Sequence, residues 1–381
     1  MKEGWQTKTL GEALRINSGE KFFYVFRDYK SNLEFVRSGK EIHERGMYAE
    51  LKAFEYQVFL DFREVEDHTG EYSRIARHLH GKGVQSVQQV LLEMRLAPVH
   101  EELKRLLSKD NVEDLTAYCL AAARQKSASK RLHDIETQFA VLCEEVGKYK
   151  RLSLDPSVAR SRFIKGVDAI AAAWMLLTDA AKSKSKIKSS ARKGGAASAD
   201  MLKDLAHSEN LLLLYCWATV EELALLLVPG PSSARIAEAF NELDLAKSLS
   251  GILHEHGRSR GAVRREISLV RILARHSQLL IDADAHNRFI KMEQLFDDYE
   301  VREFIIVNLH EGTWFFNKES MQELLRWLFL ISIVQLIRGG TVSVEELGRV
   351  FAERFAFIRE LEELSASSGF DMEKLRVLLS P

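Results

Sequence analysis

The sequence predicts an α+β protein, mostly α, with a short N-terminal antiparallel β-domain followed by a large α-helical domain. Aromatic and β-branched residues gather in short runs within the first sixty-odd residues, which is typical of strands. After Gly83, apolar residues recur every three or four positions, which is typical of amphipathic helices. We therefore expect a β-domain over residues 1–68, a helical subdomain over 69–181, a flexible linker over 182–199 and a second helical subdomain over 200–381.

Short polar breaks organise the predicted sheet. The run KFFYVFRDYKSNLEFVRSG places two β-rich segments on either side of a polar turn from Tyr29 to Asn32, and GMYAELKAFEYQVFLDFREV repeats this arrangement. Four or five strands of this length make only a thin sandwich. We therefore expect one apolar face of the sheet to need a partner.

Capping signals and apolar periodicity define the first helices. Ser86 and Gln89 have the spacing of a capping box, and Pro98 suits the first position of a further helix. Two longer helices carry apolar seams that predict packing in helical hairpins. The seam residues are Leu132, Ile135, Phe139, Leu142, Val146 and Tyr149 in one helix, and Phe163, Val167, Ile170, Trp174 and Leu177 in the next.

The segment from Lys182 to Ala199 contains six basic residues and two glycines, and Ile187 is its one large apolar residue. Such a composition cannot bury enough apolar surface to offset its ordering entropy. The segment is therefore predicted to be a flexible basic linker, with helices resuming near Asp200.

Composition limits the classes of partner. Hydrophobic residues make 46% of the chain and charged residues 29%, and the formal net charge is -1. Such a balance gives no global attraction to nucleic acid or to an anionic membrane. Cys119, Cys143 and Cys216 are widely spaced in apolar patterns, which favours reduced core thiols over disulfides or a zinc site. The charged start MKEGWQTKT lacks the apolar core of a secretory signal, so we expect a cytoplasmic protein.

Two apolar runs raise the question of a membrane. The run from Leu211 to Val228 carries Glu221 and Glu222 near its middle, and charges at a bilayer centre cost roughly 2.5 to 3.5 kcal/mol each. The run from Trp327 to Ile337 is shorter than the ~20 residues that a span needs. Both runs are predicted to be buried helices of a soluble protein.

One stretch, NLHEGTWFFNKESMQELLRWLFL, mixes three consecutive aromatic residues with polar ones. Aromatic faces beside polar groups suit stacking on a sugar ring. The alternative, which we favour, is a buried helix start with Asn317 as N-cap and Phe316 as the preceding apolar residue. The candidate ligand-binding residues are Asn308, His310, Glu311 and Trp314.

A basic segment, GRSRGAVRREISLVRILARHSQ, is a second candidate site. Its candidate residues are Arg258, Arg260, Arg264 and Arg265, which could contact phosphates. Val263, Ile267, Val270 and Leu273 share one face of the same helix, so the arginines also fit an ordinary solvated face. Nucleic-acid binding is therefore kept as a minor alternative.

The sequence predicts no metal site and no cofactor. The pairs His78–His80 and His254–His256 have i, i+2 spacing, which points both rings the same way only in a strand. Each pair lies in or at the end of a helical pattern. The chain also has no zinc-binding His-Glu-x-x-His, no glycine-rich phosphate loop and no Gly-x-Ser-x-Gly nucleophile elbow.

Two blocks of the chain resemble parts of a known family. The N-terminal block TLGEALRINSGEKFFYVFRDYKSNLEFVRSGKEIHERGMYAELKAFEYQVFLDFREV resembles the β-domain that follows the catalytic barrel in large bacterial α-amylase-like glycoside hydrolases. Within it, Ala49 to Glu64 is similar to the closing strands, which in that family pack back on the barrel. The block QLFDDYEVREFIIVNLHEGTWFFNKESMQELLRWLFLISIVQL looks like the helical extension at the far C-terminus of the same proteins.

The resemblance implies a non-catalytic accessory region acting in α-glucan metabolism. The family hydrolyses its substrate with two carboxylates on a (β/α)8 barrel of about 250 residues, and no residue of this chain matches either of them. The resemblance therefore implies docking on such a barrel or on a second copy of the chain, with α-glucan as a further candidate ligand. The alternative is an independent helical scaffold or regulatory protein whose β-module binds another protein.

Overall fold

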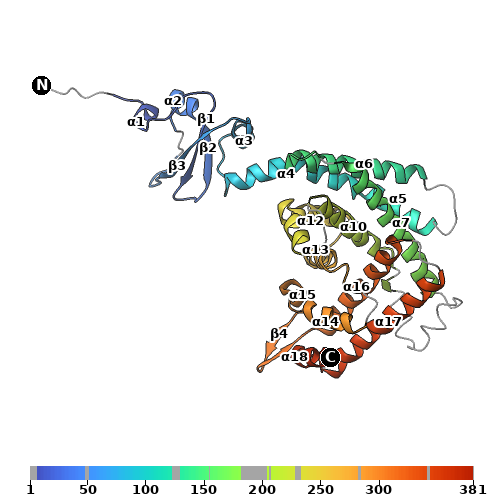
Figure 1. Cartoon of the computed structure of the whole chain (residues 1–381). Coiled ribbons are helices and arrows are strands. Elements are labelled where there is room, and N and C mark those ends of the chain that lie inside the picture. The colour runs from blue at the N-terminus through green and yellow to red at the C-terminus, as the bar shows by residue number, and fades with distance from the viewer. Residues whose placement is uncertain are drawn as a thin grey trace. The chain divides into compact units, whose positions relative to one another are not determined.

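The computed structural model describes residues 7–47, 51–121, 129–153, 155–181, 204–205, 207–227, 233–281, 285–340 and 344–380. It confirms the predicted fold class, because helices dominate and a small antiparallel sheet lies near the N-terminus (Figure 1). The predicted linker over 182–199 lies outside the described residues. The chain divides into two compact units, residues 1–97 and 98–381, called here the sheet unit and the helical unit.

The sheet unit is built around β1, whose two faces are both covered. In the described part of this unit, the sheet has three strands in the order β2-β1-β3, all antiparallel to their neighbours. The elements are α1 (Leu10–Ala13), β1 (Phe22–Asp28), β2 (Glu34–Ser38), α2 (Gly39–Arg45), β3 (Phe59–Glu66), α3 (Glu71–Leu79) and the start of α4 (Val87–Leu106).

Alternate residues of β1 supply the two small cores of the sheet unit. Phe23 and Val25 pack with Val36 and with apolar residues of α3 and α4. Tyr24 and Phe26 face the other way, where they pack with residues that include Ile16 and Ile42. Because helices or loops cover both faces of β1, the expected uncovered sheet face is wrong, and the exposed apolar residues lie instead on the edge strand β3.

Two local predictions in this unit have different outcomes. The hairpin across Tyr29 to Asn32 is confirmed, with Phe26 opposite Phe35 and Asn32 in the left-handed conformation at φ 57°. Of the second predicted hairpin, over residues 46–65, the described residues form only β3: residues 51–58 are not assigned to a strand, and residues 48–50 lie outside the described residues.

In its described residues, the helical unit consists of helices and one small hairpin near its C-terminal end (Figure 1). After α4, its elements are α5 (Lys109–Ala121), α6 (Ser129–Lys150), α7 (Pro156–Ala181), α10 (Asn210–Leu227), α11 (Ser233–Glu242), α12 (Leu245–Glu255), α13 (Arg260–Arg275), α14 (Ala285–Leu295), α15 (Tyr299–Phe304), β4 (Asn308–His310), β5 (Thr313–Phe315), α16 (Lys318–Arg338), α17 (Val344–Ser367) and α18 (Met372–Leu379).

The apolar seams predicted for α6 and α7 are confirmed as the contact between these helices. Phe139 and Phe163 stack with ring centroids 4.1 Å apart and planes 4° from parallel. Both rings are buried, as are Val167, Ile170 and Leu177 further along α7. The prediction that Pro98 begins a helix is wrong, because Pro98 lies inside α4. Ser86 initiates that helix by accepting a hydrogen bond from the Gln89 amide.

The two most apolar helices, α10 and α16, are core helices of this unit. Both are long and apolar enough to cross a membrane, but 78% of the tested window of α10 and 72% of that of α16 is buried inside the protein. Every residue from Leu211 to Ala224 is buried. This burial agrees with the soluble protein expected from the sequence.

Buried charges hold α7, α10 and α16 in register. Glu221 of α10 accepts hydrogen bonds from Gln335 and Arg338 of α16, both at 2.6 Å. Glu222 pairs with Arg338 as well, and with Arg162 of α7 at 2.9 Å. The Glu222 side chain is 1% exposed and that of Arg338 is 12% exposed. The charges are therefore desolvated, and each depends on its partners.

Replacing Arg338 by methionine should destabilise the helical unit strongly. Arg338→Met leaves two buried carboxylates without their shared cation, which costs about 3–5 kcal/mol in free energy of unfolding when one partner of such a pair is removed. Urea unfolding followed by helical circular dichroism measures this cost. The matched control is Lys148→Ala, which removes an exposed pair with Glu145 and should leave the midpoint unchanged. Equal midpoints for the two variants would contradict the assigned role of the cluster.

Candidate interaction surface

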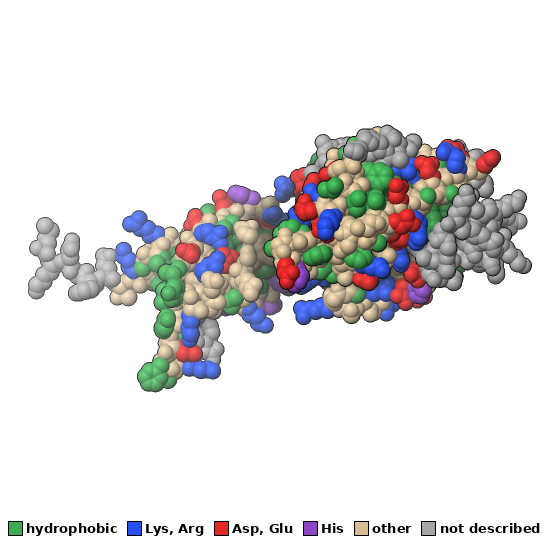
Figure 2. All heavy atoms as spheres, turned by 90° about the horizontal axis from the view of Figure 1, so that it is seen from below, with side chains coloured by type: hydrophobic (Ala, Val, Ile, Leu, Met, Phe, Trp, Pro, Cys, Tyr) green, Lys and Arg blue, Asp and Glu red, His purple; other side chains and the backbone are tan. Residues whose placement is uncertain are grey.

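A strip of exposed apolar side chains marks β3 and the segment before it. Because β3 is an edge strand, one side of it pairs with β1 and the other side has no neighbouring strand among the described residues. Phe54 is fully exposed and Tyr56 is 58% exposed. Figure 2 shows hydrophobic side chains on the part of the sheet unit that projects downward in the view. The residues of this β3 strip are Leu51, Phe54, Tyr56, Val58, Leu60 and Phe62.

The strip results from alternation along an extended backbone. Side chains at the even positions from 54 to 60 are exposed, whereas Gln57 and Phe59 are half-buried. Phe59 turns inward and meets Phe26 edge to face, with ring centroids 5.0 Å apart. A period of two is the periodicity of a strand. Residues 56–58 therefore continue the side-chain alternation of β3, although they are not assigned to the strand.

The backbone of this segment leaves polar groups open. The Tyr29 amide donates to the Val58 carbonyl at 2.8 Å, which continues the contact with β1. In an antiparallel strand, the N–H and C=O of one residue point to the same side, and successive residues alternate between the two sides. The backbone groups of Val58 therefore face β1, and those of Gln57 face the open edge. The Gln57 amide has no acceptor within the part of the chain that the structure describes. Exposed strand edges with free amides are the usual docking points for another strand.

Two residues with positive φ bound the open segment. Phe54 has φ 66° and Asp61 has φ 56°, and both angles lie in the left-handed region that non-glycine residues rarely adopt. Asp61 is the extra residue of a β-bulge, because the pairing with β1 shifts register between Val25 and Arg27. The regular part of the edge therefore runs from residue 55 to residue 60.

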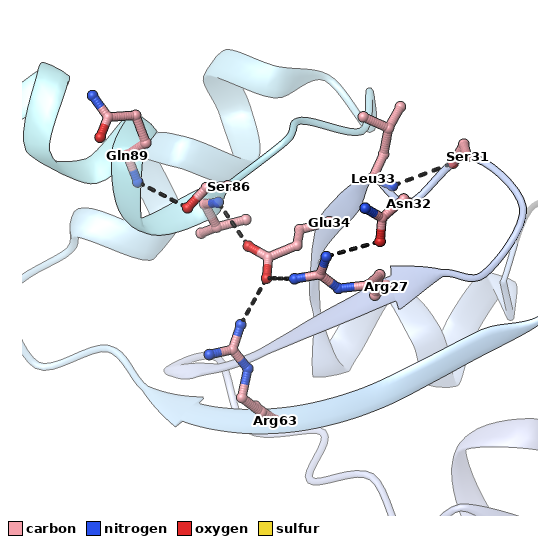
Figure 3. Close-up of polar contacts among 9 residues, drawn as sticks. Arg27, Ser31, Asn32, Leu33, Glu34, Arg63, Ser86 and Gln89 are labelled. Atoms are coloured by element: carbon pink, nitrogen blue, oxygen red, sulfur yellow. Dashed lines mark hydrogen bonds and ion pairs between the residues drawn. The ribbon is translucent and has the colours of Figure 1, made fainter. Parts of the chain in front are cut away.

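Glu34 fixes the sheet that presents the strip (Figure 3). Its carboxylate lies on the helix-covered face, where Oε1 accepts from Arg27 at 2.9 Å and from Arg63 of β3 at 3.2 Å. Oε2 accepts from the backbone amide of Val87 at 2.8 Å, at the start of α4. The carboxylate therefore joins all three strands to the first turn of α4.

The candidate sugar-binding residues of the helical unit lie on the β4–β5 hairpin, but on different faces of it. Leu309 pairs with Trp314 across the hairpin, whereas Asn308 pairs with Phe315 and His310 with Thr313. Successive residues of a strand point to opposite faces. Trp314 is therefore separated from Asn308 and His310, and Glu311 occupies the turn with φ 46°.

Each of the three consecutive aromatic residues has a different environment. Phe316 is buried, and Asn317 caps α16 by accepting from the Ser320 amide at 2.8 Å, which confirms the predicted helix start. Trp314 and Phe315 are partly exposed, and the Arg302 guanidinium lies 5.7 Å from the centre of the Trp314 ring. One face of Trp314 therefore has a cationic neighbour, and the expected burial holds for Phe316 alone.

The four candidate arginines divide into two paired and two exposed residues. Arg258 pairs with Glu209 at 2.9 Å and with Glu266 at 3.3 Å. Arg265 pairs with Glu323 and lies 4.0 Å from the centre of the Phe304 ring. Arg260 and Arg264 are exposed and have no acidic partner among the described residues. Two free cations supply little of the phosphate contact that nucleic-acid binding requires.

A cavity of about 520 Å³ in the helical unit includes Arg258. Its four acidic residues are each paired with an arginine, so the site has little net charge to offer a ligand. The acids are Asp204, Glu209, Glu266 and Glu323. Burial raises the pKa of Glu266, but its partner Arg258 opposes that shift. Nowhere in the described ranges do three or more histidine, cysteine or acidic residues form a metal-binding group.

The described residues thus define a mostly α protein with an open, apolar sheet edge. The chain matches no model of a known protein family, no curated protein and no solved structure. The resemblance to α-amylase-like proteins stays a prediction.

The sequence contained a signal for the β3 strip that our site prediction did not use. In FEYQVFLDF, residues 54–62, apolar side chains alternate with others at Phe54, Tyr56, Val58, Leu60 and Phe62. Alternation predicts a half-buried strand. Sequence alone does not say that the other half lacks a cover within the chain.

A charged cluster around His276 joins α13 to α15, just before the hairpin. The His276 Nε2 atom lies 2.9 Å from Asp298, which also pairs with Arg275. Glu300 pairs with Arg275 at 2.8 Å and with Arg271. Burial lowers the pKa of His276, and the bond to Asp298 opposes this shift without cancelling it.

Acid should weaken the helical unit through His276. Because the pKa of His276 is lower in the folded protein, the unfolded chain binds the proton more readily. The stabilisation is complete above a pH of about 6.5 and is lost as the pH falls below it. We expect His276→Asn to flatten the pH dependence of the melting temperature below neutrality, measured by scanning calorimetry. His254→Asn, at an exposed histidine, is the control, and identical pH profiles for His276→Asn and wild type would contradict this expectation.

Proposed function

We propose that this chain is a non-catalytic accessory region that docks, through the β3 strip, on the catalytic barrel of an α-amylase-like glycoside hydrolase or on a partner subunit. One observation carries the proposal. The strip, residues 51–62, falls within the block Ala49 to Glu64, which resembles the strands that pack on the barrel in that family.

Burial of the strip supplies the driving force for docking. Apolar surface removed from water stabilises a complex by roughly 25 cal/mol per Å². Phe54 and Tyr56 are large, rigid aromatic side chains that suit the buried centre of an interface. The Gln57 amide, which faces the open edge, adds a hydrogen-bond donor that a partner strand can satisfy.

The proposed role places the chemistry on the partner. Hydrolysis of an α-glucan would use two carboxylates of the barrel, and this chain would stabilise or orient that barrel. We place the pathway in the cytoplasm. The α-glucan would contact the barrel, since Trp314 lies apart from Asn308 and His310 on the hairpin and does not form a combined stacking and hydrogen-bonding platform with them.

An independent scaffold or regulatory protein is the second candidate, favoured by a second apolar surface in the helical unit. This surface lies around the hairpin, where Phe315 forms a bridge with Asp371 just before α18. A scaffold with two such surfaces could hold two partners. The exposed apolar residues are Tyr299, Ile306, Leu309, Trp314, Phe315, Val377 and Leu378.

Charge introduced into the β3 strip should abolish docking. The probe is an α-amylase-like catalytic barrel expressed without its C-terminal β-domain, and binding is measured by biolayer interferometry. Phe54→Lys with Tyr56→Lys should weaken binding at least ~100-fold, because two aromatic anchors are lost from the interface. The matched control, Val377→Lys with Leu378→Lys, alters exposed apolar residues of the helical unit and should bind like wild type. Absence of binding by the wild-type chain would contradict the proposal.

The chain alone should not be retained by glycogen. In a co-sedimentation assay, wild type and Trp314→Ala should both remain in the supernatant, because the partner barrel carries the sugar contacts in this proposal. Retention of wild type that is lost in Trp314→Ala would instead place a sugar site on the hairpin. A maltodextrin resin provides the same comparison with a shorter glucan.

A further inference from the structure

We propose that the β3 strip also pairs with the β3 strip of a second copy of this chain, antiparallel and centred on Gln57. This inference rests on the proposed interaction role of the strip and names a partner for it. Pairing would join the two sheets into one, in the order β2-β1-β3-β3-β1-β2. Residues 54–60 have three features that favour this pairing: an open edge, a self-complementary row of side chains and an uncharged residue at the centre.

The open edge has the length and geometry that strand pairing needs. Residues 55–60 are bounded by the left-handed residues Phe54 and Asp61, and the Gln57 amide, which faces the open edge, has no acceptor among the described residues. A second strand with the same free edge can accept and donate the missing hydrogen bonds. A three-stranded sheet is also small, and sheets most often have about four to six strands.

The side chains select the register. With a two-fold axis at Gln57, Tyr56 lies opposite Val58 of the second copy, and Phe54 lies opposite Leu60. Aromatic residues beside β-branched or aliphatic ones are favourable cross-strand pairs. Every exposed apolar residue from 54 to 60 therefore gains an apolar neighbour.

The neighbouring two-fold registers are less favourable. A centre at Val58 places Glu55 opposite Asp61 of the second copy, and like charges directly opposite each other are destabilising. With the two-fold axis at Tyr56, Leu60 lies opposite the charged Lys52 of the second copy and so gains no apolar neighbour. The charged pairs and the apolar pairs therefore both favour the register centred on Gln57.

The residue on the two-fold axis lies opposite the same residue of the second copy, so it must be able to pair with itself. Gln57 is uncharged, and its side-chain amide has both a donor and an acceptor. Two such amides related by a two-fold axis can bond to each other. A charged residue at this position would face an identical charge in the second copy, which would destabilise the dimer.

The size of the contact indicates a reversible dimer. Phe54 and Tyr56 together expose on the order of 300 Å² per chain. A standard stable interface buries ~800 Å² per partner, so the strip supplies a large part of the required area but not all of it. Dimerisation should therefore depend on concentration, and a docked barrel would compete for the same strip.

A cysteine crosslink tests the register directly in the full chain. In Gln57→Cys, the two introduced thiols face each other across the axis, at the Cα separation of about 4.5–5.5 Å that a cross-strand pair has and a disulfide accepts. Mild oxidation followed by alkylation should give a covalent dimer on a non-reducing gel. The native Cys119, Cys143 and Cys216 are buried and should not contribute.

Glu55→Cys is the matched control. In the proposed register, residue 55 of one copy lies opposite residue 59 of the second copy. The two residues 55 are therefore about 13 Å apart along the strands, at ~3.3 Å per residue, which is too far for a disulfide. We therefore expect at least tenfold less crosslink from Glu55→Cys than from Gln57→Cys. Equal crosslinking of the two variants would overturn the register.

Sedimentation equilibrium tests the dimer without any cysteine. Wild type should show a mass that rises with concentration. Gln57→Pro should stay monomeric because it removes the amide that faces the open edge, whereas Gln57→Ala retains that amide and should still dimerise. A wild-type monomer at all concentrations up to about 200 µM, with no Gln57→Cys crosslink, would overturn the inference. Barrel binding is measured separately on dilute chain, so loss of one interaction does not obscure the other.

Discussion

The presentation of the β3 strip depends on one buried carboxylate, that of Glu34. This group joins Arg27 of β1, Arg63 of β3 and the first amide of α4, so it fixes the sheet against the helix that continues into the helical unit. A carboxylate is suited to this position because it accepts several hydrogen bonds at once, here from two guanidinium groups and a backbone amide. The backbone pairing of β3 with β1 sets the strand's position, and the bond from Arg63 to Glu34 adds a side-chain link between β3 and β2.

The helical unit uses the same principle where apolar packing alone would be ambiguous. The apolar surface of α10 extends all round the helix, and a helix of that kind can slide or rotate against its neighbours at small cost. Glu221 and Glu222 remove this freedom because their partners stand at fixed places on α7 and α16. The two charges that argued against a membrane span in the sequence thus have a positive structural role.

The sequence predicted those parts of the fold that depend on local pattern. The seams of α6 and α7, the cap at Asn317 and the first hairpin are all set by residues close together in the chain. Pro98 was misassigned because a proline that suits a first helical turn is also tolerated inside a longer helix, as in α4. The second hairpin differs in another way: among the described residues, the segment 55–58 contacts β1 through the Val58 carbonyl but pairs with no strand on its other side.

The candidate site was harder to predict, because exposure is a property of the whole fold. Phe26 and Phe62 both lie in β-rich runs of the sequence, which do not distinguish them. In the fold, Phe26 is 3% exposed and Phe62 is 38% exposed, because only Phe26 lies in the central strand. The pairing of Arg258 with Glu209 could not be predicted from local sequence patterns either, because the two residues are 49 positions apart. Periodicity predicted which residues share a face but not which faces remain uncovered.

The outer side of β2 determines how far any edge-to-edge assembly can grow. Glu34 and Val84 exchange two backbone hydrogen bonds there, at 2.6 and 2.8 Å, so the segment before α4 already occupies the start of that side. Stacking of sheets without limit requires two free edges per molecule, as in amyloid. With β2 protected in this way, association through β3 ends at a closed pair, and the apolar strip can persist without turning the protein into a fibre.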